Sequence, residues 1–232
     1  MMTDETGPQI EDTAPSEPTA IAQWVADVLR DRIVKGSYPP GARLVERKIS
    51  AELAVSRTPV REAIKLLDAD GLIGISRNKG AQVLQFGPEE AREIFDVIAV
   101  LESLAAERFA EALTPARLET LEELHDRMMV FHKIGSHTDY FDTNSEIHDF
   151  IIAHCGNPIV IETHKRLMAR ARRGRFLAIM RPERLTEAVS EHEALMAALR
   201  QGDTGAVAQI WRAHLLHTGA TLADVLAESE PA

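Results

Sequence analysis

Residues 39–83 have the sequence PPGARLVERKISAELAVSRTPVREAIKLLDADGLIGISRNKGAQV, and this stretch decides the fold of the first part of the chain. Its centre predicts a helix that begins near Ser56, because Ser is a favoured N-cap and Pro59 falls in the first turn, where a missing N–H is tolerated. The inner face of that helix is predicted by apolar residues at helical spacing, namely Ala63, Ile64 and Leu67. Facing outward near its start are Arg57, Thr58 and Arg61.

Elements on both sides of this helix complete a small domain, predicted over residues 21–86. Upstream, the apolar pattern predicts one helix that ends at Gly36 and a short second helix over 46–54. Downstream, the turn Arg77–Gly80 predicts a hairpin, with strands over 72–76 and 81–86. Three helices and a two-stranded wing make a winged helix-turn-helix, whose recognition helix enters the major groove of DNA by its N-terminal end.

The charge distribution agrees with a DNA-binding domain at this place. The net charge of the chain is −10, but residues 21–86 carry eleven Lys or Arg against seven Asp or Glu. Residues 1–20 carry five acids and no bases, and residues 87–232 carry fifteen bases against twenty-four acids. The basic surface is therefore confined to the segment in which the winged helix-turn-helix is predicted.

Other features limit the class of protein. Residues 1–20 are acidic and rich in Pro and Thr, which predicts a disordered tail and not a secretory signal. No apolar run approaches the ~18 residues of a membrane helix, so no membrane contact is expected. Cys155 is the single cysteine. It excludes an intrachain disulfide, fits a reducing cytoplasm and is expected to be a small core residue.

Residues 89–228 predict an all-α bundle, so the chain as a whole is expected to be mainly α. Pro88 marks the boundary between the two domains. Breaks divide the rest into six helices, and they lie near 114–115, 135–136, 156–158, 181–182 and 202–203.

Three of these helices each place one histidine in the middle of a largely apolar face: His148, His192 and His214. Asn144 lies one turn before His148 on the same face. Three neutral imidazoles and an oxygen ligand suit Zn²⁺ or a related divalent ion. Each histidine could equally be a core residue that hydrogen bonds within the protein, so spacing alone leaves both interpretations open. Three further histidines show no inward phase and are expected on the surface, namely His132, His164 and His217.

The quoted stretch resembles the DNA-binding domain of the GntR family of regulators. The turn PPGARL, the helix SRTPVREAIKLL, the exit DADGLI and the wing NKGAQV match the family pattern in order and spacing. The resemblance implies DNA contacts by Arg47, Ser56, Arg57, Thr58, Arg61, Lys79 and Gly80. Ser56 could instead act only as an N-cap, and Arg61 could pair with Glu52. The resemblance also implies a homodimer on double-stranded DNA with an inverted-repeat operator, because a two-fold dimer reads two half-sites.

The second domain resembles the FCD sensor domain of the FadR branch of this family, in its six-helix form. Many such domains carry Asp or Asn, a His four residues later, and two histidines on later helices. This pattern corresponds here to Asn144, His148, His192 and His214, and it implies a divalent metal ion, zinc first, with nickel or manganese as alternatives. Asn144 lacks the charge of the Asp that is common at its position, which leaves the metal's identity open.

The resemblance also implies a small-molecule effector. Family members often place an arginine that helps to hold an effector carboxylate where this chain has Ile98. Arg172 or Arg175 could replace it, although the basic run 166–175 is also typical of a solvated helix face. The effector is expected to be a small organic acid held near the metal, or a less anionic molecule.

Together these features predict a transcriptional regulator, a repressor and not an enzyme, whose affinity for DNA is controlled by the effector. A second hypothesis is a metal-dependent hydrolase with an appended DNA-binding domain, with Glu146 or Glu193 as the base. Both residues fall off the inward faces, and no hydrolase motif is present. In a third hypothesis the histidines line a metal-free ligand pocket, which metal analysis distinguishes from the first.

Overall fold

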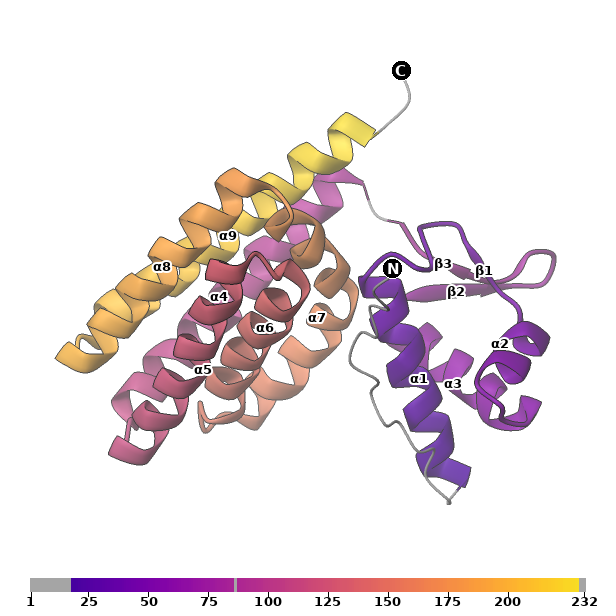
Figure 1. Cartoon of the computed structure of the whole chain (residues 1–232), viewed down its shortest axis with the longest axis horizontal. Coiled ribbons are helices and arrows are strands. Elements are labelled where there is room, and N and C mark those ends of the chain that lie inside the picture. The colour runs from indigo at the N-terminus through magenta and orange to yellow at the C-terminus, as the bar shows by residue number, and fades with distance from the viewer. Residues whose placement is uncertain (1–17, 86, 230–232) are drawn as a thin grey trace, which may run out of the picture. The chain divides into compact units, whose positions relative to one another are not determined.

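The computed structural model describes residues 18–85 and 87–229, which fall into two compact units (Figure 1). The N-terminal unit comprises residues up to Ile33 together with Tyr38–Val83. The C-terminal unit comprises Val34–Ser37 and the chain from Leu84 onward. None of the helices in the described residues combines the length and hydropathy of a membrane span.

The N-terminal unit contains three helices and a small antiparallel sheet among its described residues. The helices are α1 (Pro18–Val34), α2 (Glu46–Glu52) and α3 (Arg57–Ala69), and the strands are β1 (Arg43–Leu44), β2 (Ile73–Ser76) and β3 (Gly80–Val83). This arrangement is the predicted winged helix-turn-helix, with β2 and β3 as the wing. β1 was not predicted from the sequence. It pairs with β3 on the side opposite β2, so that the strand order is β1-β3-β2.

The largest differences from the predicted boundaries in this unit are at the start of α1 and at the end of β3. α1 begins at Pro18, inside the segment 1–20 that is predicted as a disordered tail, because Pro is well suited to the first helical position. Residues 1–17 lie outside the described residues. β3 ends at Val83 and does not reach Phe86, since Val83 already forms the last backbone hydrogen bonds of the sheet, to Gly41 and Ala42.

An apolar core holds α3 against α1 and the sheet. Its members include Val25, Leu29, Ile33, Val60, Ile64, Leu67, Ile73 and Val83, none of them more than 5% exposed. Burying one side chain of this size contributes about 1.5–3 kcal/mol. α3 is therefore fixed by its inner face, and its outer face remains available to a ligand.

The C-terminal unit is a bundle of six helices within the described residues, as predicted. They are α4 (Pro88–Glu111), α5 (Pro115–Ile134), α6 (His137–Ala153), α7 (Pro158–Ile179), α8 (Pro182–Gln201) and α9 (Thr204–Ser229). Four of them begin with proline, which lacks only an N–H that would be unsatisfied there. Gly135 and Gly202 end α5 and α8 in the left-handed conformation, with φ of 74° and 70°.

α4 and α9 lie side by side and form the most extensive helix pair of the bundle (Figure 1). Their close approach depends on Gly219 of α9, where an added Cβ would lie 2.5 Å from the Cβ of Phe95 on α4. Ile98, one turn further along α4, is fully buried. The departure from the family pattern at this position therefore places an apolar side chain in the core.

Candidate metal centre and nucleic-acid interface

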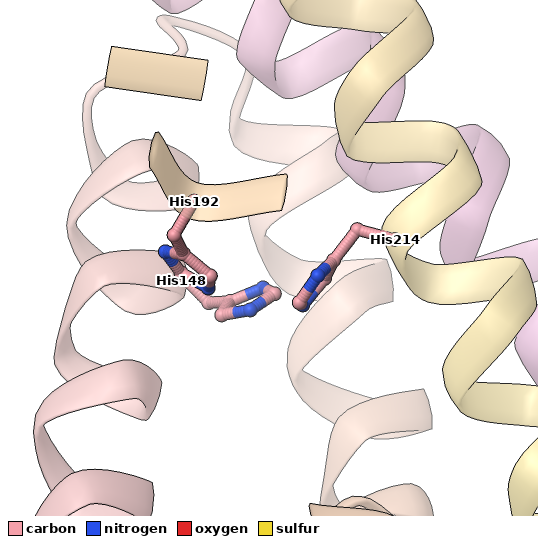
Figure 2. Close-up of side chains that lie close together, drawn as sticks. All are labelled: His148, His192 and His214. Atoms are coloured by element: carbon pink, nitrogen blue, oxygen red, sulfur yellow. The ribbon is translucent and has the colours of Figure 1, made fainter. Parts of the chain in front are cut away.

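Three histidines from separate helices meet inside the C-terminal unit, with their rings directed toward one another (Figure 2). His148 lies on α6, His192 on α8 and His214 on α9, and each is at most 2% exposed. One potential ligand atom of each histidine lies within 4.8 Å of those of the other two. The structure thus brings together the three histidines that the sequence analysis singled out, and we call them the histidine cluster.

Hydrogen bonding occupies only part of the histidine cluster. Nδ1 of His148 lies 2.5 Å from Glu102 Oε2, and Nδ1 of His214 lies 2.7 Å from Glu191 Oε2. The Nε2 atom of His148 and both ring nitrogens of His192 are buried and have no hydrogen-bond partner in the part of the chain that the structure describes, and the same is true of Oδ1 of Asn144. Each such atom costs about 1–3 kcal/mol. A divalent ion that accepted one lone pair each from His148, His192 and Asn144 would remove most of this cost, so the residues fit the implied metal.

Burial keeps the three imidazoles neutral. It lowers the pKa of His148 to about 3, and the positive charge of Arg175 acts in the same direction. The pKa values of His192 and His214 are also lowered, again chiefly by burial. At neutral pH the cluster therefore offers the unprotonated form of imidazole, which is the form that binds metals.

Trp211 forms an apolar wall beside the histidine cluster. It is fully buried on α9, stacks on His214 with ring centroids 4.9 Å apart, and has its ring centroid 4.3 Å from that of His148. Such a wall excludes water, and electrostatic interactions are stronger where water is absent.

Glu102 and His164 belong to this site, and the sequence analysis missed both. Glu102 on α4 is fully buried and lies between His148 and Nε2 of His164, which is 2.9 Å from Oε1. Burial alone raises the pKa of this carboxyl, but the hydrogen bonds from the two histidines outweigh it and hold the pKa well below its usual range. The prediction that His164 lies on the surface is wrong, since it is only 3% exposed. Of the other two, His132 is half-buried and His217 is exposed.

A signal for both residues is present in the sequence. Glu102 continues the inward face of α4, which begins at Ala91, includes Phe95 and Ile98, and ends at Phe109. His164 continues the inward face of α7, which contains Val160, His164, Met168, Ala171, Arg175 and Ala178. A titratable residue within an apolar stripe is therefore the pattern that identifies them.

Arg175 is a buried cation without an acidic partner. It is 4% exposed, and Nη1 donates only to the sulfur of Met168, at 3.7 Å, while Nη2 has no partner. No ion pair joins it to a carboxylate within the described part of the chain. The interpretation of the basic run as a solvated face is wrong for Arg175, because it lies on the inward face of α7. Arg172 is half-buried.

Arg184, which was not singled out from the sequence, is a second buried arginine of this bundle, and its guanidinium group has hydrogen-bond acceptors and acidic partners. Its Nη2 lies 2.8 Å from Glu191 Oε2 and 2.9 Å from the carbonyl oxygen of His214, and Nη1 donates to Glu187 at 3.1 Å. The two carboxylates neutralise it. The contrast leaves Arg175 as a buried positive charge that lacks such compensation.

All seven residues that are predicted to contact DNA are exposed in the N-terminal unit: Arg47, Ser56, Arg57, Thr58, Arg61, Lys79 and Gly80. Ser56 occupies the N-cap position of α3, but its side chain makes no capping hydrogen bond. The Ser56 hydroxyl therefore does not cap the helix.

Glu46, on α2, orients two of these arginines. It accepts from Nε and Nη2 of Arg61 at 3.1 and 3.0 Å and from Nη2 of Arg57 at 3.1 Å. The alternative pairing of Arg61 with Glu52 does not form, since Glu52 pairs with Arg32 at 3.0 Å. Because bidentate contacts fix the guanidinium plane, Glu46 holds Arg57 and Arg61 side by side at the start of the recognition helix.

Comparison with known proteins agrees with both units. Residues 21–83 match the family of bacterial regulatory proteins called gntR, and residues 93–217, more than half of the chain, match the FCD domain. The chain belongs to the GntR family and carries an FCD domain. It is 26% identical to the HTH-type transcriptional repressor GlaR of Escherichia coli (strain K12), over 81% of this chain and 89% of the relative. It is 27% identical to the repressor RspR of the same organism, over 87% of each.

The solved structure of E. coli McbR/YncC resembles this GntR-family chain with a TM-score of 0.79 and 25% identity, over 88% of this chain and 97% of that one. The families and these relatives are transcriptional regulators and not enzymes. The hydrolase hypothesis gains no support, and its two candidate bases, Glu146 and Glu193, are exposed.

Proposed function

We propose that this chain is a homodimeric repressor whose binding to an inverted-repeat operator is controlled by a small organic acid, held near a divalent metal ion in the FCD domain. The observation that carries the proposal is the joint burial of the histidine cluster and of Arg175. Ring nitrogens of the histidine cluster and Nη2 of Arg175 are buried without hydrogen-bond partners among the described residues. Such unpaired groups lower the stability of the folded protein, which favours a role in binding a ligand.

The metal would be held by Asn144, His148, His192 and His214, with zinc as the first candidate. Neutral imidazoles favour zinc, and nickel and manganese remain the alternatives because Asn144 contributes an uncharged oxygen. When bound, the ion supplies a positive charge that attracts the carboxylate of the effector.

Arg175 would bind that carboxylate. A buried guanidinium without an acidic partner suits an anionic ligand, because charge-assisted hydrogen bonds to a carboxylate satisfy its donors and its charge together. The Tyr140 hydroxyl is also buried and unpartnered, which provides a neutral hydrogen-bonding group within the same helical bundle. Arg172, half-buried three residues before Arg175, is the second candidate.

DNA would be contacted by the seven exposed residues of the N-terminal unit. Arg57 and Arg61 reach base edges or phosphates in the major groove, and Lys79 and Gly80 on the wing reach the adjacent backbone or minor groove. A protein with this role acts where the chromosome lies, and we infer a cytoplasmic location.

The dimer is proposed to form through α4. Val97, Val100 and Leu104 recur along one side of this helix and are 49%, 51% and 39% exposed. A two-fold interface uses the same patch on both subunits, so this apolar stripe is expected to pack against the stripe of a second copy. Val100→Arg should convert the dimer to a monomer in sedimentation experiments; an unchanged dimer would exclude α4.

The test of DNA binding is selection of genomic fragments by the purified protein, with Arg61→Ala as the control. Arg61 is exposed, and among the described residues its hydrogen bonds go to Glu46 alone, so the variant should fold normally. We expect a short inverted repeat that the variant does not enrich. Equal enrichment by both proteins would remove Arg61 from the DNA interface.

Metal analysis of protein purified without chelators tests the second domain. We expect about one divalent ion per chain, lost in His192→Ala. Protein without bound metal that still responds to an organic acid would support the metal-free pocket.

A further inference from the structure

Glu102 is the only carboxylate that the described residues place in contact with both His148 and a second buried histidine. Its Oε2 lies 2.5 Å from His148 Nδ1 and its Oε1 lies 2.9 Å from His164 Nε2. All three side chains are at most 3% exposed. Water therefore does not compete for these hydrogen bonds.

The chemistry of a carboxylate decides where the histidine protons lie. An ionised carboxylate has acceptor sites only, so each ring nitrogen in hydrogen-bond contact with it must carry a hydrogen. Nδ1 of His148 and Nε2 of His164 are therefore both donors. A neutral imidazole carries one such hydrogen, which leaves Nε2 of His148 with a free lone pair. That same Nε2 is the atom that is buried without a partner.

We propose that Glu102 is a positioning residue of the metal site, which holds His148 in the Nδ1–H tautomer and turns its Nε2 toward the ion. The inference rests on the proposed metal function, and it assigns Glu102 a role in that function. A carboxylate behind a metal-binding histidine fixes the ring orientation and makes the imidazole a stronger ligand.

Glu191 stands in the same relation to His214, with Oε2 2.7 Å from Nδ1. Arg184 Nη2 also lies 3.1 Å from this Nδ1, but it has Glu191, Thr218 and the His214 carbonyl as acceptors. The proton on Nδ1 therefore goes to the carboxylate.

His192 differs from both, since neither of its ring nitrogens has a hydrogen-bond partner among the described residues. The histidine cluster thus contains two histidines whose rings are oriented by carboxylates before metal binding, His148 and His214. The third, His192, has no such partner to fix its ring orientation.

The matched variants are Glu102→Leu, which removes both acceptors, and Glu102→Gln, which keeps one amide oxygen to accept from His148. His164→Leu is the control for damage to the core, because it removes the other hydrogen bond of Glu102 and leaves that to His148 in place. Each variant is made in the full chain, and its folding is checked by circular dichroism before measurement.

The first measurement is zinc affinity, by competition with a chromophoric chelator. We expect Kd to rise about 10- to 100-fold in Glu102→Leu, to recover partly in Glu102→Gln, and to change by less than about threefold in His164→Leu. An unchanged Kd in folded Glu102→Leu overturns the proposal. If that variant does not fold, an unchanged Kd in Glu102→Gln together with the second measurement decides.

The second measurement is the tautomer of His148 in the zinc-free wild-type chain, from long-range ¹H–¹⁵N correlation on protein with labelled histidine. A hydrogen on Nδ1 supports the proposal, and a hydrogen on Nε2 overturns it. A wild-type chain that binds no zinc would refute the metal function separately, and the tautomer would still test the role of Glu102 in orienting His148.

Discussion

Replacement of Arg175 by Met should stabilise the effector-free protein and abolish its response to the effector. Arg175 is 4% exposed and forms no ion pair with a carboxylate of residues 18–85 or 87–229. Met has a similar length and no charge, so it fills the same space on the inward face of α7 without a desolvation penalty. Most substitutions in a core destabilise, and an increase in stability would therefore be diagnostic.

The magnitude follows from two opposing contributions. Replacing buried charged groups with apolar ones of similar volume stabilises proteins by about 1–4 kcal/mol. Against this, the variant loses the contact of the guanidinium with Phe141, 5.9 Å from the ring centroid, which contributes about 0.5–2 kcal/mol. A net gain of about 1 kcal/mol is expected, which corresponds to a rise in Tm of about 2–4 °C in a domain of this size.

The assay is thermal and urea unfolding of the effector-free protein, followed by titration of small carboxylic acids against the operator complex. Arg166→Met is the matched control, because Arg166 lies on the same helix with its side chain 78% exposed. The control should stay within about 0.5 kcal/mol of wild type. If Arg175→Met is less stable than wild type, or if it responds to the acid as wild type does, Arg175 is not the residue that binds the anionic effector.

Three further outcomes are expected. Zinc at one hundred times its Kd should add about 2.7 kcal/mol to the free energy of unfolding, and calorimetry should show no such gain for His192→Ala. Asn144→Asp should tighten zinc binding by about tenfold or more. It should also lower the Tm of the metal-free protein, because the substitution buries a negative charge that only the ion neutralises. Weaker zinc binding in this variant would place residue 144 outside the metal site. Gly219→Ala should destabilise by about 1 kcal/mol in urea, since overpacking against Phe95 costs about 1–3 kcal/mol and the gain in helix propensity returns only about 1; a more stable variant would contradict the close contact between α4 and α9.

The fold was predictable because local chemistry determines it. The helix boundaries follow from prolines at first helical positions and from glycines at helix ends, and both act over a few residues. The strand β1 escaped prediction because its two residues, Arg43 and Leu44, have no periodicity to detect. They become a strand only by pairing with Gln82 and Ala81, about forty positions away.

The site was predictable only in part, for a related reason. Spacing identifies which histidines point inward, but it does not identify their partners. Glu102 is 46 positions from His148 and 62 from His164, and no local rule connects them. Arg175 lies on an inward stripe, yet the four other arginines of the run 166–175 made the segment resemble a solvated face.

The buried charges show why an ion and an acid would favour each other's binding. With neutral histidines, Glu102 and Glu191 contribute two negative charges near the cluster, and Arg175 and Arg184 contribute two positive charges. Arg184 is already neutralised by its carboxylates, and Glu102 is satisfied by its two histidines. A divalent ion would add two positive charges near Arg175, more than the negative charges of Glu102 and Asp149, which act on Arg175, can balance. An anionic effector would compensate them, and by thermodynamic linkage each ligand would raise the affinity for the other by the same factor.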